Sequence, residues 1–190
     1  MIAGLTEVLY EMGYQKTTVS LIGRRAAVSK SDFYKHFESK DDCFFAAYEA
    51  AIERIREKVL AAGSKYEEEW PLRVRDGIAS LLRALAADPA LASIALVEGL
   101  RAGRGVYDRY QAAVESFVTC LREGVPKAPD GAEVPAATDE AVVGGIASLL
   151  GRRVLANEAE QIEKLLPEVL EFALTPYLGT AEARRIISAG

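Results

Sequence analysis

Hydrophobic residues recur at helical spacing from the start of the chain. The spacing i, i+3, i+4, i+7 defines one face of an α-helix, and it is occupied by Leu5, Val8, Leu9 and Met12. Gly13 follows directly, and glycine is the commonest residue just past a helix C-terminus. We therefore predict an amphipathic first helix that ends at Gly13.

Two short helices and the start of a third are predicted in residues 17–40. Thr18 is a good N-cap for the first of them, over residues 19–27. Ser29 and Ser39 each precede an aspartate by three residues, which is a variant capping box with Asp in place of Glu. These serines are expected to start the second and third helices.

The helix between the two serine caps is only about eight residues long, and such a helix is marginal in water unless it packs on a core. Phe33 and Phe37, one turn apart, are expected to anchor it. The opposite face carries Lys30, Ser31, Tyr34, Lys35 and His36. A helix anchored on one side and polar on the other is the arrangement that a helix-turn-helix reader of the DNA major groove requires.

The rest of the chain is also predicted to be helical. The expected helices span residues 40–62, 71–87, 89–101, 106–123, 138–156, 158–166 and 167–178. Their starts are indicated by Pro71, by the Asp88-Pro89 pair, by Thr138 as an N-cap and by Pro167. The fold class is therefore all-α, with a three-helix head over residues 1–48 and a helical body over residues 49–190.

The charge distribution modifies a composition that is otherwise that of a globular protein. The chain of 190 residues is 50% hydrophobic and 27% charged, with a formal net charge of −5. Residues 15–40, however, contain six cations and two anions. Because local charge governs attraction to phosphate, the head remains compatible with nucleic acid despite the acidic total.

The cysteines and the apolar runs indicate an intracellular, non-membrane protein. Cys43 and Cys120 lie far apart in the sequence and form no C-x-x-C motif, so both are expected to be reduced core residues. No apolar run reaches the length of a membrane span, and no secretory signal is evident. The expected compartment is the cytoplasm.

Catalytic and metal-binding patterns are absent from the sequence. His36 is the one histidine, so a histidine cluster for a metal is excluded. The segment 103–105, Gly-Arg-Gly, is too short for a phosphate-binding loop and lacks its lysine. We therefore expect no enzyme activity, no cofactor and no metal.

Residues 17–40 resemble the DNA-binding head of the tetracycline-repressor (TetR) family. The matching positions are Thr18, Ile22, Ala26, Val28, Ser29, Tyr34, Phe37 and Lys40. Two positions depart from the family pattern: Gly23 stands where the family usually has Ala, and Ala27 stands where it usually has Gly in the turn. If that turn residue has positive φ, Ala27 is strained.

The resemblance implies a set of DNA contacts in the head. The expected DNA-binding residues are Thr18, Arg24, Ser29, Lys30, Ser31, Asp32, Tyr34, Lys35, His36 and Lys40. Lys40 resembles the family's phosphate-binding lysine. Arg24 and Arg25 are equally compatible with backbone contacts and with a solvated surface.

Small residues in the segment 141–155 predict a close helix contact. Three glycines within one helix cost roughly 1 kcal/mol each relative to Ala, so a closely packed neighbouring helix is expected. This neighbour lies either within the subunit or in a dimer partner, and the family forms its dimer through its last two long helices. The expected interface residues are Gly144, Gly145, Ala147, Ser148, Leu149, Val169 and Phe172.

The middle helices contain more apolar residues than one helix face requires. These residues either fill a solid core or line a pocket for a small, mostly hydrophobic effector. The expected pocket residues are Leu82, Leu85, Leu96, Leu100, Tyr107, Tyr110, Phe117 and Leu121. The helix over residues 40–62, which carries the head, should touch this pocket through Ile55 and Val59. Glu98 and Arg101 are expected either in the pocket or at the surface.

The function expected from these features is a homodimeric transcriptional regulator that binds a palindromic double-stranded DNA operator. The resemblance to the TetR family implies a repressor. A small-molecule effector would release it from the DNA. The alternative is a helical small-ligand carrier or enzyme without a DNA role, which would leave the basic face of the head unexplained.

Overall fold

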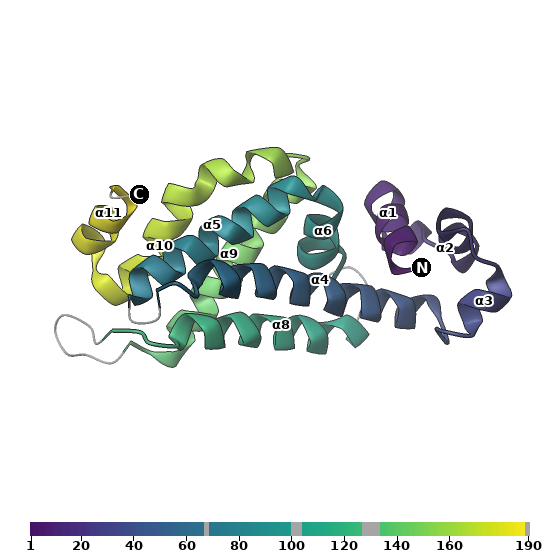
Figure 1. Ribbon diagram of the computed structural model, residues 1–190, viewed down its shortest axis with the longest axis horizontal. Coiled ribbons are helices and arrows are strands. Elements are labelled where there is room, and N and C mark those ends of the chain that lie inside the picture. The colour runs from purple at the N-terminus through teal and green to yellow at the C-terminus, as the bar shows by residue number, and fades with distance from the viewer. Residues whose placement is uncertain (67–68, 100–103, 127–133, 189–190) are drawn as a thin grey trace.

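The computed structural model describes residues 1–66, 69–99, 104–126 and 134–188, and within these ranges it contains helices and no strand. The predicted all-α class is confirmed. Figure 1 shows an elongated molecule with a small head at one end, where the chain begins, and a larger body that carries the C-terminal helix at the far end.

The head contains three helices and one turn of 3₁₀-helix. They are α1 (Ile2–Met12), the 3₁₀ turn Tyr14–Lys16, α2 (Val19–Ala26) and α3 (Lys30–Tyr34). Helix α3 has five residues instead of the predicted eight, because the chain tightens after Tyr34 and the backbone N–H of His36 bonds to the carbonyl of Phe33. Phe33 is fully buried, whereas Phe37 is only half-buried.

The two departures from the family pattern meet at the turn between α2 and α3: Ala27 lies in the turn, and Gly23 of α2 packs against it. Ala27 has a φ of 54°, so the expected strain at this position is present. A Cβ on Gly23 would lie 2.8 Å from the carbonyl oxygen of Val28. Gly23 is therefore required by the close approach of the turn to the last residues of α2.

Helix α4 (Lys40–Gly63) runs without a break from the head into the body. Its N-terminus is capped by the Ser39 hydroxyl, which accepts the Asp42 backbone N–H at 3.0 Å. The Asp42 carboxylate in turn accepts the backbone N–H of Glu38 at 3.0 Å. The predicted domain boundary at residue 48 falls inside this helix and stays a prediction.

The body consists of the following helices. They are α5 (Trp70–Ala87), α6 (Pro89–Ser93), a π-helical turn (Ile94–Glu98), α8 (Arg104–Arg122), α9 (Ala136–Leu155), a 3₁₀ segment (Ala159–Leu165), α10 (Leu166–Leu178) and α11 (Thr180–Ser188). Helix α9 starts two residues before the predicted cap at Thr138, because Pro135 already has a suitable φ and has no N–H to satisfy.

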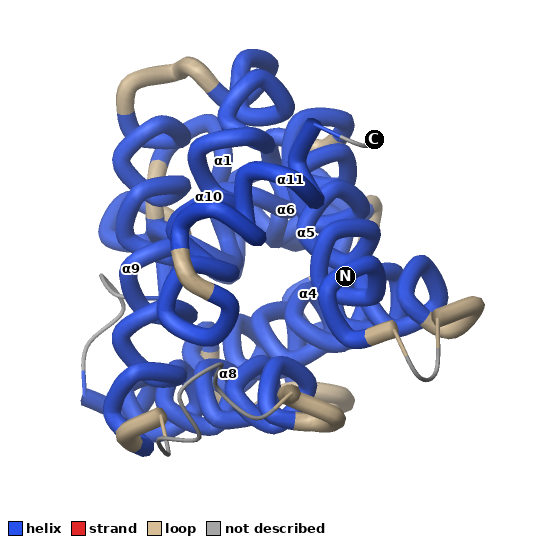
Figure 2. The backbone as a smooth tube through the Cα atoms, turned by 90° about the vertical axis from the view of Figure 1, so that its left-hand side faces the viewer, coloured by secondary structure: helices blue, strands red, loops and turns tan. Residues whose placement is uncertain are grey.

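The body helices are arranged in a ring. Viewed along the molecule, α4, α5, α10, α9 and α8 follow one another around it (Figure 2), and each packs against the next. The short α6 and the π-helical turn sit at the head-proximal end of this ring and contact α1, α4 and α9.

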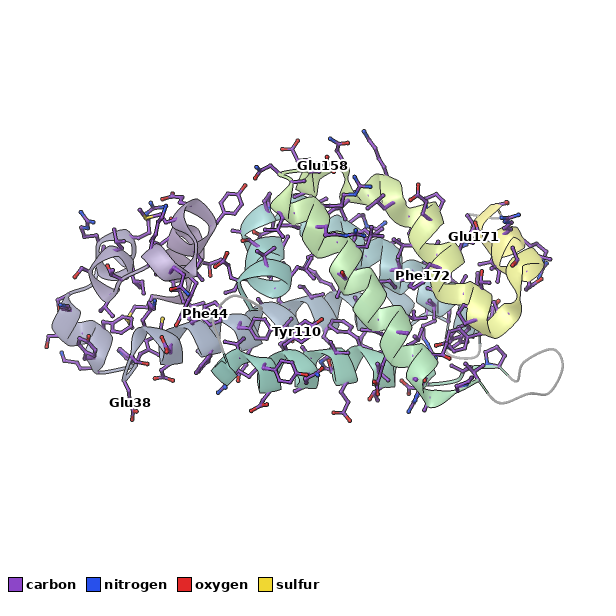
Figure 3. All side chains as sticks on the ribbon, turned by 180° about the vertical axis from the view of Figure 1, so that it is seen from behind. Glu38, Phe44, Tyr110, Glu158, Glu171 and Phe172 are labelled. Atoms are coloured by element: carbon purple, nitrogen blue, oxygen red, sulfur yellow. The ribbon has the colours of Figure 1, made fainter. Side chains whose placement is uncertain are left out.

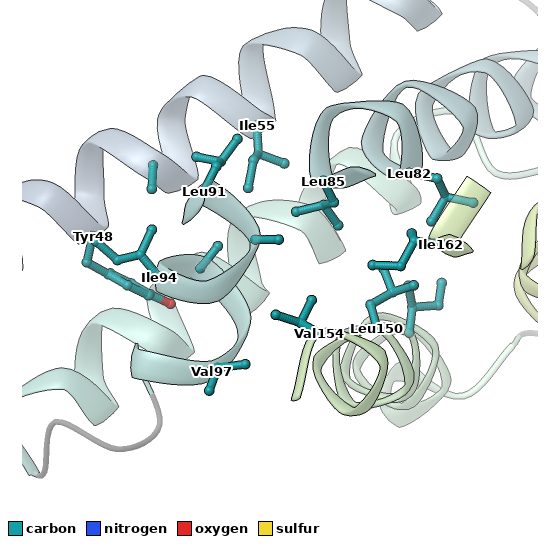
Figure 4. Close-up of a cluster of buried hydrophobic side chains, with 14 of the residues drawn as sticks. Tyr48, Ile55, Leu82, Leu85, Leu91, Ile94, Val97, Leu150, Val154 and Ile162 are labelled. Atoms are coloured by element: carbon teal, nitrogen blue, oxygen red, sulfur yellow. The ribbon is translucent and has the colours of Figure 1, made fainter. Parts of the chain in front are cut away.

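A continuous apolar core joins the two parts. Figure 4 shows Tyr48 from α4 beside Ile94 of the π-helical turn, with Leu85 and Leu150 further into the body. All four side chains are almost completely buried. Helix α4 therefore contributes to the core of both the head and the body.

Among the described residues no single helix is long and apolar enough to cross a membrane; only α5 combined with the Pro89–Glu98 segment, bent by 109°, passes that test by length and composition.

Candidate functional site

The exposed face of α3 is polar and cationic. Lys30, Lys35 and His36 are exposed, and Tyr34 is 53% exposed although it is aromatic. Figure 3 places Glu38, which follows this face, at the lower edge of the head with its side chain pointing away from the protein. This end of the molecule therefore presents hydrogen-bonding groups and a ring to solvent.

Asp32 organises the first turn of α3. Its backbone N–H donates to the Ser29 hydroxyl at 3.0 Å, and its carboxylate accepts the Ser29 hydroxyl and the Lys35 ammonium, both at 2.6 Å. The ammonium of Lys35 and the hydroxyl of Ser29 lower the pKa of the Asp32 carboxyl. This pair is exposed, so Lys35 can exchange Asp32 for a phosphate at small cost.

The two arginines of α2 have different surroundings. Arg25 forms ion pairs with Glu7 and Glu11 of α1, at 2.9 and 2.6 Å, and so connects the first two helices. Arg24 is exposed, as are Thr18 and Ser31. The sequence left open whether these arginines contact the DNA backbone or are solvated. In the structure Arg25 is paired with α1, and Arg24 is exposed to solvent.

Lys40 is not a simple surface lysine. Its ammonium lies 3.9 Å from the centre of the Tyr14 ring and donates to the Tyr14 carbonyl oxygen at 3.1 Å. The Tyr14 hydroxyl donates to the carboxylate of Asp41, and burial together with this bond raises the pKa of Tyr14. Tyr14 is thus fixed against the first turn of α4.

Tyr14 also connects the head to the body. Its backbone N–H donates to the Glu98 carboxylate at 2.7 Å, and Glu98 is only 3% exposed. Glu98 ends the π-helical turn, whose earlier residues Ala95 and Leu96 face into the body. Sequence reasoning missed this link because nothing in the local pattern places residue 98 next to residue 14.

The body contains an apolar cavity of about 420 Å³, partly open to solvent, between the helices of the ring. This volume lies in the range of small-molecule sites, which is roughly 300–1,000 Å³. The walls come from α4, α5, the π-helical turn, α8, α9 and α10. The residues that line the cavity include Ile55, Val59, Arg73, Leu96, Phe117 and Leu150.

The structure brings together some of the predicted pocket residues and not others. Leu85, Leu96, Phe117 and Leu121 line the cavity, as do Ile55 and Val59 of α4. Leu82 is buried in the core outside it, and Leu100 and Arg101 lie outside the described residues.

The two predicted pocket tyrosines do not line the cavity. Tyr107 is 57% exposed, and its hydroxyl accepts a hydrogen bond from Gln111 at 2.6 Å. Tyr110 is half-buried on the same helix. The prediction placed residues from both halves of α8 in the pocket, whereas only the second half of this helix borders the cavity, through residues such as Phe117 and Cys120.

The residues predicted for a dimer interface lie on α9 and α10, which pack against each other. Ser148 is exposed, Leu149 is half-buried, and Phe172 is 49% exposed although it is a large apolar residue. Figure 3 shows Phe172 beside α9. Val169 is buried within the subunit, and Ala147 borders the cavity.

The glycines of α9 have different surroundings. A Cβ on Gly145 would lie 3.0 Å from the Phe172 ring, and a Cβ on Gly151 would lie 3.2 Å from the carbonyl oxygen of Leu96. Gly144 has open space beside it. Two of these glycines therefore permit close packing inside the subunit, while Gly144 is available to a partner.

In the described part of the chain, no three His, Cys, Asp or Glu side chains are placed to hold a metal ion.

Comparison with known families identifies the head. Residues 2–47 match the family described as bacterial regulatory proteins, tetR family. The head of the chain is therefore a TetR-family DNA-binding domain. Helices α2 and α3 form the helix-turn-helix of this domain, which is the DNA-binding element of the family. A comparison with curated protein sequences finds no match.

Solved structures share the fold of the whole chain. The fatty acid degradation regulator FadR from Bacillus halodurans is 17% identical, with a TM-score of 0.77 over 92% of this chain and 95% of its own. FadR from Bacillus subtilis in complex with stearoyl-CoA is 16% identical, with a TM-score of 0.76 over 94% of this chain and 96% of its own. A TetR-like regulator from Rhodococcus sp. RHA1 is 17% identical, with a TM-score of 0.70 over 92% and 91%.

Proposed function

We propose that this TetR-family regulator binds a two-fold symmetric operator as a homodimer and is released from it by a hydrophobic effector held in the body. The observation that carries the proposal is the apolar cavity of about 420 Å³, which borders the same helix, α4, that carries the head. One helix thereby contacts both the effector site and the DNA-binding element.

DNA binding is assigned to the exposed face of α3. Tyr34 and Lys35 are the residues best exposed for base-edge or phosphate contacts, and a good base contact contributes roughly 1–3 kcal/mol of discrimination. Lys30 and His36 flank them, and Lys40 reaches phosphate by leaving its site on Tyr14.

Dimerisation is assigned to α9 and α10. Phe172, a large apolar residue, is 49% exposed on this pair of helices, and Gly144 leaves room for a partner helix. A stable obligate dimer needs an interface on the order of 2,000 Å² or more. Two copies joined here carry two reading helices, as a palindromic operator with half-sites about one DNA turn apart requires.

The effector acts on the head through two contacts. Ile55 and Val59 place α4 in the cavity wall, and Leu96 places the π-helical turn there. The same turn ends in Glu98, which bonds the head at Tyr14. An effector that displaces either wall changes the distance between the two α3 helices of the dimer. It favours the conformation released from DNA only as far as it binds that conformation more tightly than the DNA-binding one.

A fatty acyl compound is the first effector candidate. Support comes from the apolar lining of the cavity and from the similarity in fold to a FadR described in complex with stearoyl-CoA. Burial of each methylene contributes about 0.8 kcal/mol, so a long aliphatic chain would bind with useful affinity.

The proposal is tested with DNA fragments from upstream of the chain's own gene. The dimer should shift one such fragment in a gel, and lauroyl-CoA or laurate should reverse the shift. Phe117→Arg, which puts a charge into the cavity wall, should abolish the reversal and leave DNA binding intact. A protein that binds such chains but no DNA would instead support the helical carrier.

A further inference from the structure

The polar groups of the cavity are gathered at one end. A Cβ on Gly63 would lie 2.6 Å from Cγ of Arg73, and a Cβ on Gly77 would lie 3.2 Å from Val59. These two contacts set α4 and α5 antiparallel, with the end of α4 beside the start of α5. Arg73, Ser64, Cys120 and Glu123 all belong to this end of the lining.

The opposite end of the cavity is entirely apolar. Leu85 lies twelve residues beyond Arg73 on α5, which is about 18 Å along the helix axis. Leu85, Ala95, Leu96 and Leu150 form that end of the lining. The cavity is therefore elongated, polar at one end and apolar at the other, and this matches a linear amphiphile better than a compact molecule.

Arg73 is held in place at the polar end. Its side chain passes between Gly63 and Gly124, and a Cβ on Gly124 would lie only 3.1 Å from Nη2. That nitrogen is buried. Because the guanidinium is fixed by packing before a ligand arrives, it loses little conformational entropy on binding, and its planar fork suits a carboxylate or carbonyl oxygen.

Glu123 lines the same end but is exposed. Water and salt screen its charge. The repulsion between Glu123 and a negatively charged head group beside Arg73 is therefore weak.

We infer that Arg73 binds the acyl oxygen of a linear fatty acyl effector, with the head group at Arg73 and the end of the chain at Leu96. This inference rests on the proposed effector site and adds the orientation of the ligand and the residue that selects its head group. A free fatty acid and its CoA thioester both carry the required oxygen.

The test compares head groups on one chain length. Affinities of laurate, lauroyl-CoA and dodecanol are measured by isothermal titration with the parent dimer, Arg73→Gln and Arg73→Lys. Arg73→Gln should lower the affinity for laurate or lauroyl-CoA, whichever binds more tightly to the parent, by about tenfold to a hundredfold. It should leave the affinity for dodecanol unchanged. Arg73→Lys should restore part of the loss, because it keeps the charge without the fork.

The matched control is Arg75→Gln on the same helix, since Arg75 is paired with Asp76 and does not line the cavity. It should change none of the three affinities. Thermal unfolding of each variant shows whether it is folded.

A second variant tests the orientation independently of Arg73. Leu96→Trp shortens the apolar end, so it should weaken laurate more than octanoate. The inference would be overturned if Arg73→Gln weakened the binding of laurate and dodecanol equally. It would also be overturned if Leu96→Trp weakened the binding of laurate and octanoate equally. Neither result would affect the proposed effector site. Failure of all chain compounds to bind the parent would overturn the proposed effector site as well.

Discussion

The carboxylate of Glu98 accepts the backbone N–H of Tyr14 at 2.7 Å, across 84 residues of sequence. Glu98 is almost completely buried. Tyr14 is in turn bonded to Lys40 and Asp41 in the first turn of α4. The end of the π-helical turn therefore contacts the same point of the head that positions the start of α4.

Replacing Glu98 with Ala should lower the free energy of unfolding by about 1–3 kcal/mol, because the buried N–H of Tyr14 loses its acceptor. The measurement is urea denaturation followed by circular dichroism. Glu98→Gln keeps an acceptor oxygen and should cost less. Glu49→Ala removes an exposed carboxylate paired with Arg109 and serves as the control, with a loss below about 1 kcal/mol. Equal losses for Glu98→Ala and Glu49→Ala would show that the Tyr14 bond contributes nothing.

Tyr34→Ala and Lys35→Ala should weaken operator binding without changing the unfolding transition, since both side chains are exposed. Each should cost roughly 1–3 kcal/mol if it contacts a base edge. Phe33→Ala should instead destabilise the head by about 3–5 kcal/mol, because it empties a fully buried site. Gel shifts and thermal denaturation separate the two effects. Unchanged affinity for both surface variants would mean that another face reads the DNA.

Gly144→Arg should convert the proposed dimer into a monomer. A side chain at this position meets no atom of its own subunit, so a folded monomer points to a clash across the interface. Phe172→Glu should act in the same direction by placing a charge on the exposed apolar surface. Sedimentation velocity at micromolar concentration gives the answer. Gly145→Glu is a poorer probe, because it would collide with Phe172 within the subunit. A Gly144→Arg protein that remained dimeric would place the interface elsewhere.

Ala27→Gly should stabilise the head by about 1 kcal/mol, because glycine adopts positive φ without the cost that an L-residue bears. Gly23→Ala should have the opposite effect, since the added Cβ would lie 2.8 Å from a backbone oxygen. Both variants are compared with the parent by differential scanning calorimetry. A loss of stability in Ala27→Gly would indicate that the turn does not retain this conformation in solution.

Stability should fall at alkaline pH partly through Cys43. Burial raises the pKa of this thiol to about 11, above its ordinary value of 9.0. The unfolded chain therefore loses the thiol proton first, and the contribution of Cys43 to stability, complete below pH 9.0, is lost as the pH rises towards about 11. Across this pH interval the free energy of unfolding should fall less steeply for Cys43→Ala than for the parent protein. Identical slopes would contradict the assignment.

Several features of the protein follow from local sequence alone. Helical periodicity and the serine caps predicted the helix-turn-helix and the all-α class, and the structure has the Ser29 and Ser39 caps in place. These signals are readable because a cap or a helix face involves residues no more than a few positions apart. The expectation of strain at Ala27, by contrast, came from the resemblance to the TetR pattern, which usually has Gly at this turn position, and the φ of Ala27 is positive.

Only the tertiary structure decided which apolar residues face the cavity and which polar residues connect different parts of the protein. Tyr107 and Phe117 lie on one helix and look alike as amphipathic positions, yet one is exposed and the other lines the cavity, because α8 borders the cavity only in its second half. Glu98 and Arg73 were indistinguishable from surface charges until packing placed them against Tyr14 and between Gly63 and Gly124. Such roles depend on contacts between residues distant in sequence, which periodicity does not encode.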